Sequence, residues 1–581
     1  MKLLKPSPHR ARNDFDLSHR HVYTANFGEL LPSTCIETVP GDHIVLHASD
    51  LLRAIPMVTS PFLRAKQHID VWFVPYKDLW HNFDNFITQK EQPVSSALRQ
   101  STYCPHFNLY DLWNHAQVPN ASGIAYDIVG RPFDAGAKKL LNLLGYGYTT
   151  VGSSTAQNVE VNPFRLYAYN YIWYNEYRQK YYDDGTYGFI SGTDDAFAAA
   201  ELFNADFMHC GSVSSANIAS PTYGLDSSGH IGFAALLQMR YRTWKKDLFT
   251  GLLPSTQFGS VSTVPVPNID SALKLVDTSG NDVTQQRALT LYQSKLASSS
   301  QVTNGQAPAT WANSNLNAKA GTFNLDVLAL RRSEAVQIWR ENALRAGNRV
   351  ADNMNAHYGV ESDFRDHRPT YLGSVSSPLN IGDVMVTANS DYSGNTNPNT
   401  NVGDVAGKGL SSLNEKVFTY DAKDFGVIMA IHSILPEAEY NAQGVSRPNQ
   451  LLESEDFFVP EYENLGLEAV SSQNFVNVVL NDAKVVGYAP RYYAYKTKLD
   501  KCYGEFMTSK MFAPWCSPKY DVTLNMGSPG YSIPLACLYV NPAIFDVNFN
   551  VAVSVSDQFL CDVYYDVDAV RPMSVVGLPF S

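Results

Sequence analysis

The chain of 581 residues carries little charge, since Asp, Glu, Lys and Arg make up only 17% of it. Globular proteins average about 25%. Hydrophobic residues make up 45%, which is enough to build a large core. A surface made of Ser, Thr, Asn, Gly and Tyr suits contact with other subunits better than isolated solvation. The same composition also fits a neutral-surfaced monomer, so this alternative stays open.

Paired cysteines and long apolar runs are also missing. The seven cysteines are scattered, odd in number and never spaced as C-x-x-C, so they predict neither a disulfide framework nor a zinc site. They favour a reducing compartment during folding. No run approaches 18 apolar residues, and the first residues, M-K-L-L-K-P-S-P-H-R-A-R, have no apolar segment. We therefore expect neither a membrane-spanning helix nor a signal peptide.

Catalytic motifs are absent as well. Neither G-x-S-x-G nor H-E-x-x-H occurs, and the phosphate-loop-like residues 403–409 lack the first glycine and the Ser or Thr that would bind Mg²⁺. The histidines near the start of the chain have no Cys or carboxylate at metal-ligand spacing. We therefore predict no enzymatic activity, no cofactor and no metal.

Charge is unevenly distributed along the chain. The formal net charge is -12, which argues against a general polyanion-binding body. Residues 1–21 instead hold five basic and two acidic side chains. Prolines at positions 6, 8, 32 and 40 interrupt any helix there. We predict a modestly basic, extended N-terminal arm over residues 1–50.

The clearest periodicity lies in residues 546–557, D-V-N-F-N-V-A-V-S-V-S-D, where valines and a phenylalanine alternate with small or polar residues. A period of two predicts a half-buried strand. Residues 66–76 show the second such pattern, and we expect both strands in one sheet system. Shorter strands are predicted at residues 427–434, 476–479, 485–489 and 492–498. Short strands with long connections favour a β-sandwich with Greek-key links.

Two segments read as surface loops. Residues 255–321 are rich in Ser, Thr, Asn, Gln and Ala and predict a surface protrusion. Residues 374–414 are rich in Gly, Asn and Ser and predict a second surface loop. No linker is evident, so we expect residues 51–581 to form a single domain with insertions.

Helical spacing occurs in residues 77–88, 162–182 and 325–358. The second of these has Asn162 as its expected cap and Pro163 at its first helical position. Its aromatic residues could stack on nucleobases, but we favour packing between subunits or against the β core. The candidate residues are Tyr167, Tyr171, Trp173, Tyr174 and Tyr177.

Several blocks together resemble one protein family. They include residues 19–42 (H-R-H-V-Y-T-A-N-F-G-E-L-L-P-S-T-C-I-E-T-V-P-G-D), 62–76 (F-L-R-A-K-Q-H-I-D-V-W-F-V-P-Y), 162–178, 247–254 (D-L-F-T-G-L-L-P), 368–373 (R-P-T-Y-L-G) and 571–580 (R-P-M-S-V-V-G-L-P-F). In this order they resemble the major capsid proteins of the Microviridae, small single-stranded DNA phages. The place of residues 255–321 is similar to that of the insertion that forms a three-fold spike in the gokushovirus branch.

The resemblance implies an eight-stranded antiparallel jelly roll with long loop and helical insertions. It implies a virion protein, made and assembled in the bacterial host cytoplasm, that forms pentamers and a T=1 icosahedral shell around circular single-stranded DNA. A small basic DNA-packaging protein, other minor virion proteins and a host surface receptor would be its partners. Candidate DNA contacts are Lys2, Lys5, Arg10, Arg12 and Arg20. The alternative is a cellular jelly-roll carbohydrate-binding protein.

Overall fold

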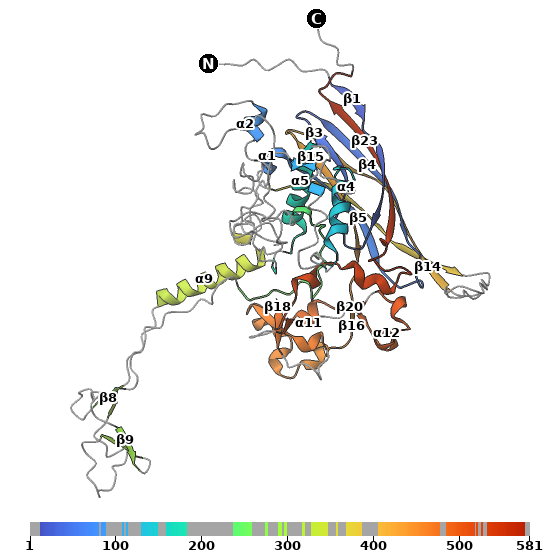
Figure 1. The fold of residues 1–581 in the computed structure, drawn as a ribbon. Helices are drawn as coiled ribbons and strands as arrows, with labels where there is room; N and C mark the ends of the chain where they lie inside the picture. The colour runs from blue at the N-terminus through green and yellow to red at the C-terminus, as the bar shows by residue number, and fades with distance from the viewer. Residues whose placement is uncertain are drawn as a thin grey trace, which may run out of the picture. The chain divides into compact units, whose positions relative to one another are not determined.

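Two units of the chain are visible in Figure 1, Met1–Thr256 with Glu361–Ser581 and Gln257–Val360. The structure is a computed structural model. It describes residues 12–80, 83–88, 107–109, 112–113, 129, 131–148, 159–179, 181–182, 236–257, 274–276, 289–292, 295–298, 317–319, 327–346, 356–357, 368–385, 405–476, 484–509, 511–517, 519–520, 525–526 and 531–575.

The first sheet of the larger unit has the order β2, β23, β4, β14, β13, and β1 extends β2 along the edge of β23. β23 pairs with β4 from Phe559↔Ala54 to Val570↔His43. β1 pairs with the end of β23, so the described chain begins and ends side by side. The strands are β1 (Asn13–Asp16), β2 (His19–Ala25), β4 (His43–Ala54), β13 (Asn380–Met385), β14 (Val405–Asp421) and β23 (Phe559–Arg571).

The second sheet has the order β12, β5, β15, β3 and is also antiparallel. Its strands are β3 (Leu31–Thr38), β5 (Ala65–Pro75), β12 (Thr370–Pro378) and β15 (Gly426–Pro436). β5 and β15 confirm the strands predicted at residues 66–76 and 427–434. Side chains from both sheets form one apolar cluster, so the sheets pack face to face.

The strand order follows a simple rule. With the principal described strands counted in chain order as β2, β3, β4, β5, β12, β14, β15 and β23, the first sheet pairs strands 1, 8, 3 and 6 and the second pairs strands 2, 7, 4 and 5. Strands that are consecutive in the chain therefore mostly lie in opposite sheets. The mainly β, antiparallel sandwich predicted from the sequence is confirmed.

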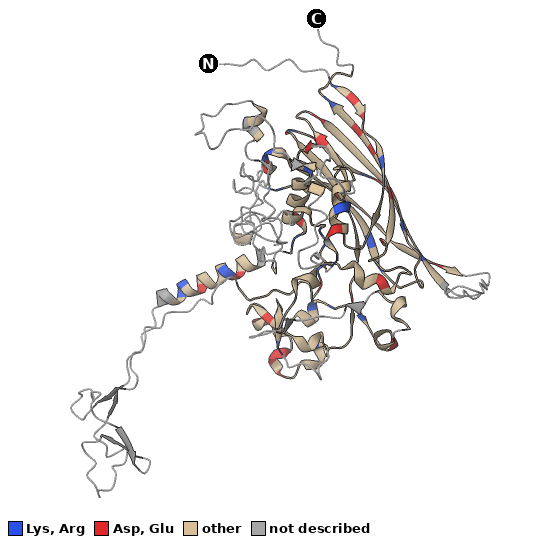
Figure 2. Cartoon of the chain, viewed as in Figure 1, with Lys and Arg blue, Asp and Glu red and all other residues tan. Residues whose placement is uncertain are grey.

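The two sheets differ in what covers them. Along β23 every second residue from Phe559 to Ala569 is at most 1% exposed, and the residues between them face outward. This period of two marks a sheet with one solvated face. β15 is instead buried almost throughout, because helix α5 (Phe164–Ile172) packs on the outer face of the second sheet. Figure 2 shows acidic and basic residues interspersed on the first sheet.

The strand predicted at residues 546–557 is wrong. A 3₁₀-helix, η11 (Pro542–Val547), precedes a series of turns, and the closing strand begins only at Phe559. The Asp546 carboxylate accepts a hydrogen bond from the Val553 N–H at 2.8 Å, and the Asn548 amide donates to two backbone carbonyls at 3.0 Å. These bonds fix a loop, and Val555 lies 79% exposed.

Residues 13–50 differ from the predicted extended arm, since they form β1 to β4. The prolines do not prevent this, because Pro32 lies in β3, which is an edge strand where a missing N–H is tolerated. The predicted surface loop at residues 374–414 is wrong at both ends, where β12, β13 and β14 lie; residues 386–404 are outside the described part. Position 407 in β14 requires glycine, because a Cβ atom there would overlap the Thr59 carbonyl oxygen.

Several shorter elements complete the larger unit. Residues 77–88 form two short helices, and residues 492–498 contain a helix, α11, where a strand was predicted. The predicted strand at 485–489 is confirmed as β18, and most of 476–479 lies outside the described residues.

The helices are α1 (Tyr76–Leu79), α2 (Phe83–Ile87), α4 (Phe133–Leu143), α11 (Tyr493–Lys496) and α12 (Glu505–Thr508), with π-helix η1 (Trp173–Tyr177). The 3₁₀-helices are η4 (Arg447–Gln450), η5 (Ser454–Asp456), η6 (Pro460–Tyr462), η7 (Ser472–Asn474), η9 (Ala513–Trp515) and η10 (Leu535–Leu538). The short strands are β6 (Phe107–Asn108), β7 (Glu160–Val161), β16 (Glu439–Asn441), β17 (Leu467–Ser471), β18 (Val485–Pro490), β19 (Lys501–Cys502), β20 (Lys519–Tyr520), β21 (Asn525–Met526) and β22 (Tyr531–Ser532).

The smaller unit holds the long helix predicted at residues 325–358, which is α9 (Val327–Ala346). It also holds two antiparallel pairs, β9 with β10 and β8 with β11. These are β8 (Lys274–Val276), β9 (Leu289–Tyr292), β10 (Lys295–Ser298) and β11 (Asn317–Lys319). Most of the predicted protrusion at 255–321 lies outside the described residues. None of the helices seen in either unit is long and apolar enough to span a bilayer.

Candidate functional site

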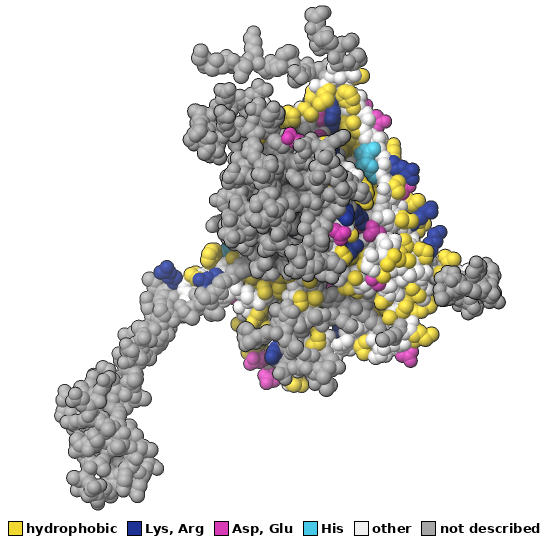
Figure 3. All heavy atoms as spheres, viewed as in Figure 1, with side chains coloured by type: hydrophobic (Ala, Val, Ile, Leu, Met, Phe, Trp, Pro, Cys, Tyr) yellow, Lys and Arg dark blue, Asp and Glu magenta, His cyan; other side chains and the backbone are white. Residues whose placement is uncertain are grey.

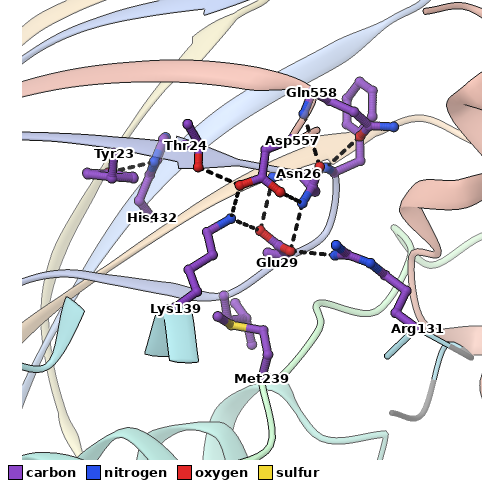
Figure 4. A network of polar contacts seen from close by, with 12 residues as sticks. Tyr23, Thr24, Asn26, Glu29, Arg131, Lys139, Met239, His432, Asp557 and Gln558 are labelled. Carbon is purple, nitrogen blue, oxygen red and sulfur yellow. Dashed lines mark hydrogen bonds and ion pairs between the residues drawn. The ribbon is translucent and has the colours of Figure 1, made fainter. Parts of the chain in front are cut away.

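A cluster of four charged side chains lies at the turn between β2 and β3 (Figure 4). The Glu29 carboxylate in this turn forms ion pairs with the Arg131 guanidinium at 2.6 Å and with the Lys139 ammonium at 2.7 Å. Lys139, on α4, also reaches Asp557, just before β23, at 2.9 Å. The cluster therefore joins three segments that are more than 100 residues apart in the chain.

Local hydrogen bonds hold the turn that presents Glu29. Asn26 donates its backbone N–H to Glu29 Oε2 at 3.0 Å and its side-chain amide to Glu29 Oε1 at 2.9 Å. Gly28 between them has φ +76°, a left-handed conformation that glycine adopts without strain. Gln558 donates its N–H to Asn26 Oδ1 at 3.0 Å, so the same turn is tied to the start of β23.

The charges of the cluster stabilise one another. Burial alone would raise the pKa of Glu29, but the positive charges of Lys139 and Arg131 hold it below its ordinary value. Burial likewise opposes ionisation of Lys139, yet Glu29 and Asp557 raise its pKa. Burial would also raise the pKa of Asp557, and Lys139 lowers it. All these groups are therefore ionised at neutral pH.

The cluster has the properties of a buried ion-pair network that holds segments of the chain together. The Glu29 side chain is only 1% exposed, and Arg131 and Lys139 are 14% and 17% exposed. The Glu29 and Asp557 carboxylates already accept several hydrogen bonds, among them those from Asn26. Within the described ranges, no group of three or more His, Cys, Asp or Glu side chains is arranged to hold a metal ion.

The predicted aromatic helix is α5 continued by η1, and it is fixed to the second sheet. The Tyr177 hydroxyl donates to Asp70 on β5 at 2.8 Å and accepts from Trp72 Nε1 at 3.2 Å. The Arg240 guanidinium lies 4.0 Å above the Trp173 ring. Burial favours packing over nucleobase stacking for the candidate residues, of which Tyr174 is half-buried and the rest are buried: Tyr167, Tyr171, Trp173, Tyr174 and Tyr177.

The candidate DNA contacts are not brought together by the described structure. Lys2, Lys5 and Arg10 lie outside the described residues, and Arg12 is exposed immediately before β1. Arg20 on β2 makes two hydrogen bonds of 2.6 Å to the Asp562 carboxylate on β23. Arg20 therefore already has an acidic partner within the chain.

Exposed apolar side chains gather in the segment between β15 and η11. Leu452 is 86% exposed, Leu465 is 65% exposed and Met511 is 78% exposed. Apolar side chains are visible on the lower part of the larger unit in Figure 3. Others in the segment are Phe457, Phe458, Tyr495, Tyr503 and Phe506. Isolated exposed apolar residues are ordinary. These are grouped along one segment of the chain, which makes that segment the candidate contact surface.

A sequence model described as capsid protein (F protein) matches residues 5–119 and 139–580. The chain belongs to this capsid protein family. It is 22% identical over 635 aligned positions to capsid protein VP1 of Chlamydia phage 1, with 98% of this chain and 95% of that protein covered. It is 23% identical over 589 positions to capsid protein VP1 of Bdellovibrio phage phiMH2K, with 99% and 96% covered.

Both relatives are Microviridae proteins, so the resemblance predicted from the sequence is confirmed. The chain is a major capsid protein, and membership of this family favours a structural role over the carbohydrate-binding alternative. The sequence reading missed the buried cluster of Glu29, Arg131, Lys139 and Asp557. Its one available signal was a charged residue inside an apolar stretch, as in A-N-F-G-E-L-L around Glu29.

Proposed function

We propose that this capsid protein assembles with copies of itself, through pentamers, into a T=1 icosahedral shell that encloses circular single-stranded DNA. The observation that carries the proposal is the set of exposed apolar side chains between β15 and η11, on a chain of the capsid family. Repeated contacts of one surface with its neighbours close by symmetry into a finite shell. Interfaces of this kind bury roughly 1,200–2,000 Å² each.

The sandwich suits this role. Its strand order, 1-8-3-6 in one sheet and 2-7-4-5 in the other, supports an eight-stranded jelly roll with β1 and β13 as extensions. The long segments between strands then carry the contacts, while the two sheets hold them rigidly. We propose a single jelly-roll capsid domain for the larger unit and a surface protrusion for residues 255–321.

Assembly is tested with Leu452→Asp and Leu465→Asp, two charges placed on exposed apolar positions. The wild-type chain should elute as megadalton particles and show shells in negative-stain microscopy, whereas the double variant should stop at subunits or pentamers with unchanged circular dichroism. Ser454→Asp adds one charge at an exposed polar position and is the control. If the double variant forms shells as readily as the control, this surface does not drive assembly.

We further propose that Lys2, Lys5, Arg10 and Arg12 contact the DNA backbone. Four such contacts give a salt slope of about -2.8 for single-stranded DNA, at about -0.7 per phosphate. This is weak, so a small basic packaging protein would supply further charge, as would other minor virion proteins. Deleting residues 1–12 should lower the DNA content of particles, and Arg20→Ala should not. Equal DNA content after the deletion counts against the arm.

Host attachment is a separate proposal for residues 255–321, where a long polar segment interrupts the family blocks. The test replaces the segment by a short Gly-Ser linker in assembled particles. Particle yield should stay the same and adsorption to host cells should fall. Normal adsorption by the trimmed particles would assign the receptor contact to another surface.

A further inference from the structure

The longest described helix leaves apolar side chains open to solvent. On α9, Leu330 is 43% exposed, Ile338 is 52% exposed and Trp339 is 59% exposed. Leu330 and Ile338 are eight residues apart, so they lie on the same side of the helix, and Trp339 follows directly. A surface helix normally turns its apolar face toward another element. The exposed face of α9 is therefore a candidate contact surface.

The same helix is basic. Arg331 and Arg332 are exposed, and neither forms an ion pair with a described residue. Figure 2 shows basic positions along the helix. Trp and Arg are among the residues most enriched where an interface concentrates its binding energy. The helix has a net charge of +2 (4 minus 2) from Arg331, Arg332, Arg340, Arg345, Glu334 and Glu341.

Opposite charge lies on the surface proposed for assembly. Residues 451–468, here called the acidic segment, hold six acidic and no basic side chains, a net charge of -6. Leu452 and Leu465, which are 86% and 65% exposed, lie among these acidic residues. Four of the acidic side chains are exposed as well: Glu453, Glu455, Glu461 and Glu463. The acidic segment thus combines exposed apolar surface with negative charge.

Internal contacts fix the conformation of the acidic segment. The Arg447 guanidinium forms ion pairs with Asp456 at 2.9 Å and with Glu468 at 3.0 Å, so one cation joins two parts of the segment. The Phe458 ring packs edge-on against the Tyr492 ring, with 5.3 Å between their centroids. A surface that is already ordered loses less conformational entropy when it binds a partner.

Charge decides which partner each of these two surfaces favours. Two acidic segments in contact would place a net charge of -6 against -6, and two α9 helices would place +2 against +2. Like charges across an interface suppress association, whereas opposite charges promote it. The combination that both surfaces favour is α9 with an acidic segment.

We propose that α9 of one copy docks on the acidic segment of a neighbouring copy, with its apolar face on the exposed leucines and its arginines beside the exposed glutamates. This docking rests on the proposed assembly function and names the partner of the assembly surface. Each copy gives its helix to one neighbour and receives a helix from another. Such head-to-tail contacts close into rings when the rotation between copies allows it.

Charge reversal tests the docking in the full-length protein. The helix variant, Arg331→Glu with Arg332→Glu, changes the charge of α9 from +2 to -2. It should raise the protein concentration at which half of the chains assemble by at least about tenfold, as measured by light scattering and negative-stain microscopy. The segment variant changes the acidic segment from -6 to +2 and should have the same effect; it combines Glu453→Lys, Glu455→Lys, Glu461→Lys and Glu463→Lys.

The two sets of substitutions in one chain should recover much of the assembly, because opposite charges then face each other again. The matched control is Lys408→Glu with Lys416→Glu, which reverses two exposed lysines on β14 and changes the net charge as much as the helix variant does. This control should assemble like wild type. An equal loss in the control and the helix variant, or no recovery in the combined variant, would overturn the docking.

Mixing the helix variant with the segment variant separates contacts between copies from contacts within one chain. At a concentration where wild type assembles, each variant alone should remain unassembled, because its helix and its acidic segment carry like charges. In an equal mixture the helix of each variant meets opposite charge on the other variant. Native mass spectrometry should therefore detect complexes that contain both variants, and their absence would reject a contact between copies.

A single substitution tests the apolar part of the docking without changing any charge. Trp339→Ala removes the most exposed of the three apolar side chains and should also raise the half-assembly concentration at least about tenfold. An unchanged concentration would overturn the docking. If wild type forms shells and the helix variant forms them at the same concentration, the docking is wrong and the assembly function stands. If wild type forms no shells, both are wrong.

Discussion

Replacing Lys139 by Met tests the buried ion cluster most directly. The ammonium lies 2.7 Å from Glu29 and 2.9 Å from Asp557, and Glu29 is 1% exposed. At an effective dielectric constant of about 20, each contact has a Coulomb energy of roughly 6 kcal/mol. Most of this is offset by removing the three charges from water, and breaking a buried pair by deleting one partner costs about 3–5 kcal/mol.

The matched control is on the same helix. Lys138→Met removes a partly exposed lysine whose ion pair with Asp134 spans 3.4 Å, so its loss should change stability by less than about 0.5 kcal/mol. Thermal melting at pH 7 should show Lys139→Met shifted downward by roughly 2–5 °C relative to this control, because the unfolding entropy of so long a chain is large, and urea titration should show the matching loss of stability. Equal shifts in the two variants would show that the cluster contributes no net stability.

The pH dependence gives a second measure of the same cluster. Lys139 helps to depress the pKa of both Glu29 and Asp557, so their contribution to stability is present above their unfolded pKa and is lost as pH falls. Acid should therefore destabilise wild type more steeply than Lys139→Met. Adding Asp557→Asn to Lys139→Met should recover part of the stability, because Asp557 is then no longer a carboxylate deprived of its lysine, whereas Glu29 keeps the Arg131 guanidinium.

Three other substitutions follow from the packing. Tyr177→Phe removes a buried hydroxyl that bonds a carboxylate and an indole, and urea unfolding should register a loss of about 1–3 kcal/mol. Gly407→Ala places a methyl group against a backbone carbonyl and should lower the melting temperature by the equivalent of about 1–3 kcal/mol, whereas Gly382→Ala, with nothing near its Cβ, should not. Val555→Ser should be neutral within about 0.5 kcal/mol because the side chain is 79% exposed; a loss near 2 kcal/mol would restore the strand predicted there.

The sequence alone determined several elements of the fold. β5, β15 and α5 follow from their own hydrophobic patterns, because burial of one or both faces of an element imposes a period on its sequence. α9 follows from its helical spacing, although Leu330, Ile338 and Trp339 on it are 43%, 52% and 59% exposed. The mainly β class follows from the same patterns. Family-wide blocks, spread over nearly the whole chain, then identified the capsid role.

Only the tertiary structure decided which alternating stretch pairs with β4. Residues 546–557 and Phe559–Arg571 both alternate, but the first makes loop hydrogen bonds to backbone groups and the second finds a partner strand. Likewise, the glycines of β14 predict a loop from the sequence. The structure shows that Gly407 lies in a strand, where the nearby Thr59 carbonyl leaves no room for a side chain. Strand pairing depends on two segments at once, so the pattern of one segment alone does not predict its partner.

The same reason applies to the buried polar groups. Glu29 and Asp557 are more than 500 residues apart in the chain and meet through Lys139. Whether a charged residue is solvated, paired or neutralised depends on the groups around it after folding, and the chain order does not specify those neighbours.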